Sequence, residues 1–279
     1  VPDESAIFSI ALNTQDLRSI PVSGNPSGIA LSDDGNALFV ALSEQGSVSI
    51  LNLDSEIENV IDVATELGTD AAWDVLPMDD RFYTVGNPGV GDAFVTSTNV
   101  NDGISTRIAD QLIVRDDPSL SKAVDDHIFV RSGLAEDRID KIDSTTDELI
   151  LQRTGLNTLT RSGLAVVQDG SALALTQSNG LGLLVDADDL LPMSGDIGIL
   201  NSTIENDPRL FTAWFPIFGG TAQLLTAIAH PGGDVTSDAA VIQCDGFFMQ
   251  NVDHLQAIAG GTGFLVLQGD EICIYYPFE

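Results

Sequence analysis

The sequence predicts an all-β fold, a single β-propeller with six blades, with seven blades as the alternative. Three observations lead to this prediction: a pattern that recurs after 135 residues, further copies of its turn in between, and short apolar runs separated by Asp- and Gly-rich turns. A chain of 279 residues can bury a large core, and all-β domains of this size are common. We therefore expect residues 1–279 to form one domain.

The recurring pattern consists of two apolar strands around a tight turn. Residues 27–31 and 34–40 match residues 162–166 and 169–175, and the two copies lie 135 residues, or three units of 45, apart. An Asp-Gly pair separates the apolar runs in both copies, and glycine supplies the positive φ that such hairpin turns require. Each copy therefore predicts a pair of antiparallel strands.

Intermediate and later copies extend the pattern along the chain. Residues 78–85 and 124–130 each place an acidic turn before a short apolar strand, and these two copies are 46 residues apart. Weaker copies with Gly-rich turns follow at residues 218–221 and 260–263, which brings the number of turns to six. The turn count is the basis for six blades.

Each repeat has room for four strands. In the first repeat, an apolar run at residues 47–52 follows the hairpin, and a more polar run at 58–63 comes next. Four short antiparallel strands every 40 to 50 residues are typical of a propeller blade. Residues 55–67 show some helical periodicity, but their β-branched content favours an outer strand and a loop.

The two ends of the chain predict how the ring closes. Residues 264–268 and 271–276 supply strands of the last blade, and residues 6–12 and 17–22 supply strands that can complete it. Pairing of the N- and C-terminal strands would remove exposed sheet edges. Together the ends hold one strand more than a four-stranded blade needs.

The charge of the chain excludes several partners. Its formal net charge is −31, from 42 acidic and 11 basic residues, so nucleic acid and anionic lipid surfaces would be repelled. This balance suits high salt or abundant divalent cations, and it equally suits an ordinary acidic extracellular surface. The longest apolar runs are shorter than the roughly 18 residues of a membrane-spanning helix, so we expect no membrane span.

Metal-ligating residues form only weak candidate sites. Calcium prefers carboxylate and carbonyl oxygens, which makes the loop residues Asp186, Asp188 and Asp189 candidates, together with His230 and Asp234. None of them fits a twelve-residue calcium loop, so a hydrated acidic turn is the favoured interpretation. We expect no other cofactor.

A Gly-x-Ser-x-Gly nucleophile elbow, a Gly-rich phosphate-binding motif and a Cys-x-x-Cys-His haem-attachment motif do not occur in the sequence. We therefore predict no catalytic residues, and a non-catalytic protein is favoured over an enzyme.

Two cysteines, Cys244 and Cys273, lie 29 residues apart near the C-terminus. This spacing matches no metal motif. They are either a disulfide, formed in an oxidising compartment, or two buried free thiols.

The first repeat resembles the YVTN family of β-propeller repeats. Within residues 19–53 it reads Asn-Pro-Ser-Gly-Ile-Ala-Leu at 25–31, Asp-Gly at 34–35, Leu-Phe-Val-Ala-Leu at 38–42 and Val-Ser-Ile-Leu-Asn at 48–52. The fourth repeat retains part of this pattern. The second, third and fifth depart from it, so the seven blades usual in that family are not carried over.

The resemblance implies an extracytoplasmic protein, because YVTN-type repeats are similar to those of prokaryotic surface-layer proteins. We therefore expect a secreted or cell-surface propeller that serves as an interaction or assembly module, with a protein partner or self-assembly. One alternative is a propeller enzyme, lactonase-like or associated with an oxidoreductase, whose site lies at the mouth of the central channel. The other is a subunit of an extracellular fibre or particle.

Overall fold

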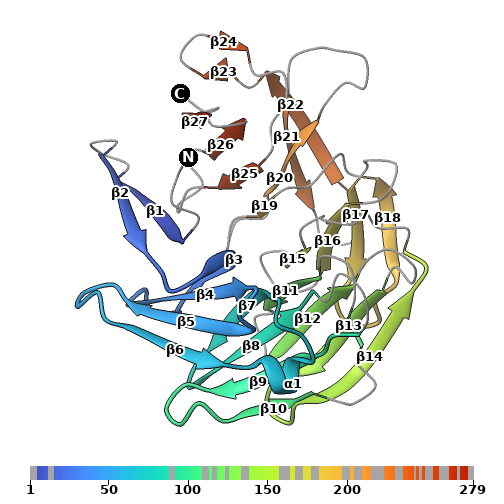
Figure 1. Cartoon of the computed structure of the whole chain (residues 1–279). Coiled ribbons are helices and arrows are strands. Elements are labelled where there is room, and N and C mark those ends of the chain that lie inside the picture. Colours follow the sequence, from blue (N-terminus) through green and yellow to red (C-terminus); the bar gives the residue numbers. More distant parts are fainter. Residues whose placement is uncertain are drawn as a thin grey trace. The chain divides into compact units, whose positions relative to one another are not determined.

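The computed structural model of the chain consists almost entirely of β-strands (Figure 1). Beyond residue 193 it describes the backbone alone. The described residues are 5–11, 16–87, 92–108, 113–114, 118–122, 126–132, 138–156, 164–166, 172–176, 182–196, 202–203, 209–214, 223–229, 235–241, 243–244, 247–248, 254–257, 264–268 and 271–275.

The chain divides into two compact units, which are described separately. Unit 1 comprises residues 1–122 and 126–150, and unit 2 comprises residues 123–125 and 151–279. The expectation of one domain over residues 1–279 stays a prediction.

Unit 1 contains three four-stranded sheets, each formed by strands that pair in chain order. Sheet I consists of β3 (Asn25–Leu31), β4 (Ala37–Ser43), β5 (Ser47–Asn52) and β6 (Glu58–Asp62). Sheet II consists of β7 (Ala72–Met78), β8 (Arg81–Gly86), β9 (Val95–Asn99) and β10 (Ser105–Arg107). Sheet III consists of β11 (Ser119–Lys122), β12 (His127–Ser132), β13 (Arg138–Asp143) and β14 (Glu148–Thr154), whose end passes into unit 2.

Sheet I buries both of its faces. Successive side chains of a strand point to opposite faces, and in β4 Phe39 and Ala41 join one apolar cluster while Val40 and Leu42 join another. The first cluster contains Phe82 of sheet II, whose ring centroid lies 5.7 Å from that of Phe39. Sheets I and II therefore pack face to face.

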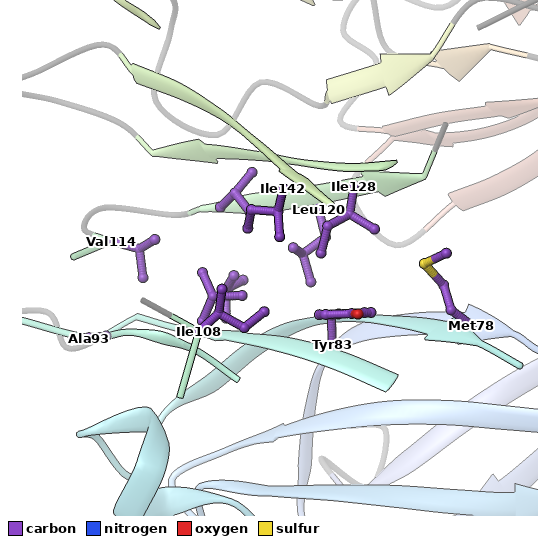
Figure 2. Close-up of a cluster of buried hydrophobic side chains, with 11 residues drawn as sticks. Met78, Tyr83, Ala93, Ile108, Val114, Leu120, Ile128 and Ile142 are labelled. Carbon is purple, nitrogen blue, oxygen red and sulfur yellow. The ribbon is translucent and has the colours of Figure 1, made fainter. Parts of the chain in front are cut away.

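A second apolar layer joins sheets II and III. Figure 2 shows its side chains pointing toward one another between the two sheets. The cluster is made of Met78, Tyr83, Val85, Ala93, Val95, Ile108, Val114, Leu120, Ile128, Val130 and Ile142.

An N-terminal hairpin covers the other face of sheet I. β1 (Ala6–Ala11) pairs with β2 (Asp16–Pro21), and Ile7 and Val22 are buried in the cluster that contains Val40. The hairpin thus supplies the apolar layer that sheet II supplies on the opposite face.

Unit 2 contains two four-stranded sheets and two smaller ones. Sheet IV consists of β15 (Leu164–Val166), β16 (Ala172–Thr176), β17 (Gly182–Asp186) and β18 (Pro192–Asp196). Sheet V consists of β19 (Ser202–Thr203), β20 (Arg209–Trp214), β21 (Gln223–Ala229) and β22 (Val235–Val241). β23 (Gln243–Cys244) pairs with β24 (Phe247–Phe248), and β25 (His254–Ala257), β26 (Phe264–Gln268) and β27 (Glu271–Tyr275) form a three-stranded sheet.

The structure confirms an all-β chain built from four-stranded antiparallel sheets, and it corrects one counted turn. Residues 218–221 fall between β20 and β21, the second and third strands of sheet V, whereas the other counted turns follow the first strand of a sheet. The first two strands of sheet V are joined instead through residues 204–208. The six-blade count and the pairing of the N- and C-terminal strands stay predictions.

The segment at residues 55–67 forms strand β6, as predicted, followed by one helical turn that was not predicted, α1 (Ala64–Leu67). Gly68 ends this turn in the left-handed conformation, with φ 76°. A side chain at Gly68 would meet the Phe94 ring at 2.9 Å, so the turn requires glycine for its conformation and for space.

A buried tyrosine ties sheet II to sheet III. The single hydrogen of the Tyr83 hydroxyl is shared between Asp147 Oδ1 at 2.7 Å and the Ser144 carbonyl oxygen at 3.0 Å. Arg81 Nη1 lies 3.1 Å from the other carboxylate oxygen of Asp147. Burial, and then the Asp147 carboxylate, raise the pKa of Tyr83, so the hydroxyl stays protonated and keeps donating.

Tyr83→Phe should lower the free energy of unfolding by about 1–3 kcal/mol, because Asp147 and the Ser144 carbonyl oxygen lose the donor that they share. Urea denaturation followed by fluorescence would measure this. Thr154→Val, which removes the hydroxyl of an exposed residue in β14, is the matched control and should cost less than about 0.5 kcal/mol. Equal losses in the two variants would contradict the role assigned to Tyr83.

Candidate functional site

The first strands of the three sheets in unit 1 are the natural place to look for a site, because propellers commonly bind ligands near their innermost strands. β7 contacts both β3 and β11. Ser27 of β3 donates its hydroxyl to the carbonyl oxygen of Ala72 in β7 at 2.7 Å. A register irregularity occurs at Ser27, between Pro26 and Gly28, and a similar one occurs in β7.

Glycine at position 28 permits the close approach of β3 to β7. A Cβ atom at Gly28 would lie 2.6 Å from the Trp73 carbonyl oxygen and 2.9 Å from Asp74 Oδ1. Both distances are too short for a side chain, so glycine is needed where the two strands meet.

Asp74 occupies the equivalent place in the next repeat, 46 residues after Gly28 and 46 before Leu120. Its Oδ2 accepts the Leu120 amide at 2.8 Å, and its Oδ1 accepts the Val75 amide at 2.9 Å. The carboxylate therefore joins β7 to β11. Burial raises its pKa to about 6, although the two amides act in the opposite direction.

The first strands of the three sheets in unit 1 carry two titratable side chains. In β3, β7 and β11 the titratable side chains are Asp74 and Lys122. Both Asp74 oxygens already accept amides. The arrangement can hold a proton near pH 6, and its evident role is to tie two strands together.

The turn between the third and fourth strands has the same construction in four sheets. An Asn or Asp side chain at its first position accepts the amides two and three residues later, and the residue four positions later has a positive φ. The first residues are Asn52, Asn99, Asp143 and Asp186, with amide distances of 2.8 to 3.4 Å. The residues with positive φ are Glu56, Gly103, Asp147 and Leu190.

This turn accounts for the predicted metal candidates at residues 186–189. Asp186 Oδ1 accepts the amides of Asp188 at 2.8 Å and Asp189 at 3.3 Å, as the neutral Asn52 does in sheet I. Asp188 and Asp189 are exposed. The geometry of Asp186 is that of a turn, and it needs no cation.

The other metal candidates, His230 and Asp234, lie outside the described residues. Within the described ranges, no group of three or more His, Cys, Asp or Glu side chains is placed to hold a metal ion. Calcium binding stays a prediction. The described helices include none that is long and apolar enough to cross a membrane.

The cysteines lie in two strands of unit 2. Cys244 is in β23 and Cys273 is in β27, and these strands contact one another. His127 begins β12 as Arg81 begins β8, which places both residues directly after the turn that follows the first strand.

The turns after the first and third strands meet at one end of each sheet. In each sheet the residue directly after the turn's Asn or Asp donates its backbone amide. The acceptor is a carbonyl oxygen in the turn between the first and second strands. These bonds run from Leu53 to Asn36 at 2.9 Å, from Val100 to Asp80 at 2.9 Å and from Ser144 to Asp126 at 2.8 Å. We call this end of sheets I, II and III the turn end.

Exposed carboxylates gather on the turn end. They belong to Asp33, Asp34, Asp54, Glu56, Asp79, Asp80, Asp102 and Asp126.

Asp34 shows how such a carboxylate is held. It accepts the Ser32 hydroxyl at 2.7 Å and the Asn36 amide at 3.0 Å, and these bonds lower its pKa. The carboxylate thus stays charged to a lower pH than an isolated aspartate.

Apolar side chains protrude from the same turns. The residue five positions after the Asn or Asp is Ile57 in sheet I, Ile104 in sheet II and Leu191 in sheet IV, with exposed fractions of 68%, 62% and 42%. In sheet III this position is Glu148. Sequence reasoning missed these residues. Aligning the ends of the third strands on their Asn or Asp would have found them.

Asp186→Ala should lower the free energy of unfolding by about 1 kcal/mol, because two amides lose their acceptor. Asp186→Asn should have no effect, since Asn52 and Asn99 form the same turn. Urea denaturation with and without calcium would measure both variants. If Asp186→Asn lowers the free energy of unfolding as much as Asp186→Ala does when calcium is present, but has no effect without calcium, then the charge of Asp186 binds a cation.

Asp74 should make stability fall as the pH rises from about 4 to 6. Between its ordinary pKa of 3.8 and the folded value of about 6, the native state holds the proton more tightly than the unfolded state. Deprotonation therefore costs about 3 kcal/mol in the folded chain.

Asp74→Asn has no carboxyl group to titrate at this position, so it should not lose stability in this way as the pH rises. Its free energy of unfolding relative to wild type should therefore increase by about 3 kcal/mol between pH 4 and pH 7. Denaturation across this pH range tests it. Asp70→Asn controls for the loss of one negative charge at an exposed position. A pH-independent difference between Asp74→Asn and wild type would refute the assignment.

Comparison with known proteins identifies structures with a similar fold. No protein-family model and no curated protein matches the sequence. Among solved structures the chain is similar to Kuenenia stuttgartiensis hydrazine synthase, with TM-score 0.71, 11% identity, and 98% of this chain and 89% of that chain covered.

Two further structures show the same likeness. A chain of the mitotic checkpoint complex has TM-score 0.72 and 12% identity, with 99% of this chain and 82% of that chain covered. The β-propeller domain of Myceliophteria thermophila Cps50 (Swd1) has TM-score 0.70 and 11% identity, with 98% of this chain and 90% of that chain covered. At this level of identity the likeness concerns the fold, and the chain has the β-propeller fold.

Proposed function

We propose that this chain is a protein-binding propeller whose partner docks on the turn end. The observation that carries the proposal is the repeated exposure of a large apolar side chain at the same position of equivalent turns, in Ile57 and Ile104. Exposure of these apolar side chains to water is unfavourable, and a protein partner that covered them would remove this apolar surface from water.

The fold supports this proposal. One of the similar structures belongs by its name to a protein complex, the mitotic checkpoint complex. Propellers bind through loops held on rigid blades, and the turns of unit 1 are held by side-chain and main-chain bonds. Apolar side chains on such turns are presented at low entropic cost.

The acidic surroundings indicate the chemistry of the partner. Ile57 lies between Asp54 and Glu56 on one side and Glu58 on the other, and Ile104 comes two residues after Asp102. A partner segment with basic residues around an apolar centre would complement this surface. A second copy of this acidic chain would bring like charges together, so a different protein is favoured over self-assembly.

An extracytoplasmic location is part of the proposal. It is supported by the YVTN-like first repeat and by the acidic composition. We also propose that the propeller has six blades and that its terminal strands close the ring.

The test is affinity capture from the surface and secreted fractions of the source cells, followed by titration of each purified partner in a calorimeter. Ile57→Asp combined with Ile104→Asp should weaken binding at least tenfold, because apolar anchors carry much of the energy of an interface. Both residues are well exposed, so the fold should be unaffected.

Ile150→Asp is the matched control. Ile150 is 49% exposed, but it lies within β14 and not in a turn. This variant should bind as wild type does. The proposal fails if no partner binds saturably, or if the control loses as much affinity as the double variant.

A further inference from the structure

The C-terminal strands of unit 2 bring the two cysteines onto neighbouring strands. β27 is the last strand in the order β25-β26-β27, so one of its edges has no partner in that sheet. β23 contacts β27, and Cα atoms of the two strands approach within 8 Å. Figure 1 shows β23 between β24 and β27.

The cysteines occupy these adjoining strands. β23 has only two residues, and Cys244 is one of them. Cys273 is the middle residue of β27. Disulfides join Cα atoms about 4.4–6.8 Å apart, and Cα atoms of β23 and β27 approach within 8 Å, so the two strands are close enough for a disulfide to join them.

We propose that Cys244 and Cys273 form a disulfide that fastens β23 to β27. A free thiol pair would leave this short strand held by little else, because β23 and β24 pair through only two residues each.

Formation of the bond needs an oxidant, which would be the disulfide of an oxidoreductase or of oxidised glutathione. One cysteine thiolate attacks that disulfide, forms a mixed disulfide and releases one thiol. The second cysteine thiolate then attacks the mixed disulfide and releases the other thiol. Overall, the two cysteine protons end on the two released thiols, and the two electrons lost by the cysteine pair reduce the disulfide of the oxidant.

The sequence offers a clean way to test this. No Lys or Arg occurs after Arg209, so trypsin cannot separate the two cysteines, but Met249 lies between them. Cyanogen bromide cleaves after methionine and should yield one fragment, residues 194–249, with Cys244, and another, residues 250–279, with Cys273.

The full chain would be exported to an oxidising compartment, purified without reductant and unfolded in guanidinium. We expect no free thiol by Ellman titration and an intact mass lower by two hydrogen atoms than after reduction. The two cyanogen bromide fragments should migrate together until a reductant separates them.

Cys244→Ser and Cys273→Ser serve as matched variants. Each should show one free thiol and lower the melting temperature as much as reduction lowers that of wild type, and reductant should not lower it further. Two free thiols in the exported wild type, fragments that separate without reductant, or a bond between chains would overturn the proposal. These measurements involve no partner, so their failure is separate from failure of the proposed function.

Discussion

The described structure of unit 1 depends on each four-stranded sheet burying both of its faces. In β4 the side chains of Phe39 and Val40 point to opposite apolar layers. A strand that is buried on both faces is mostly apolar, and this makes the second strand of each sheet the most recognisable part of its repeat, although β8 and β12 also bury the polar side chains of Thr84 and Arg131. The fourth strands, which pair only with the third, are more exposed and can vary.

The same packing determines where the scarce basic residues lie. Arg107 donates from Nε to the Glu66 carbonyl oxygen at 2.9 Å and stacks on Phe94, with its guanidinium carbon 3.6 Å from the ring centroid. Arg138 Nε lies 2.8 Å from Asp140 within sheet III. Arg18, in contrast, is exposed and pairs with Glu56 on the turn end. Arg107 and Arg138 therefore serve internal contacts, and Arg18 offsets only one of the exposed carboxylates of the turn end.

The sequence predicted the parts of the fold that repeat. The Asp-Gly hairpin of the first repeat and the strands at 47–52 and 264–268 follow directly from alternation and turn residues. The turn at residues 218–221 was assigned wrongly because a Gly-rich run marks any turn between strands, and only pairing shows which strands it joins.

The candidate site was predicted less well. For Asp186 the sequence left a calcium ligand and a hydrated acidic turn as alternatives; the structure shows its Oδ1 accepting two local amides, and calcium binding stays a prediction. Asp74 attracted no notice in the sequence, since its importance comes from Leu120, 46 residues away. Interactions between repeats are a property of the packing, and no local pattern predicts them.

The turn after the third strand has a consequence for how this protein can change. Because Asn and Asp oxygens accept the same two amides, the backbone is indifferent to which of them is present. The chain can therefore gain or lose a negative charge at four places without disturbing a strand. Adaptation to a saltier or fresher medium could proceed there one codon at a time, while the blades and their packing stay as they are.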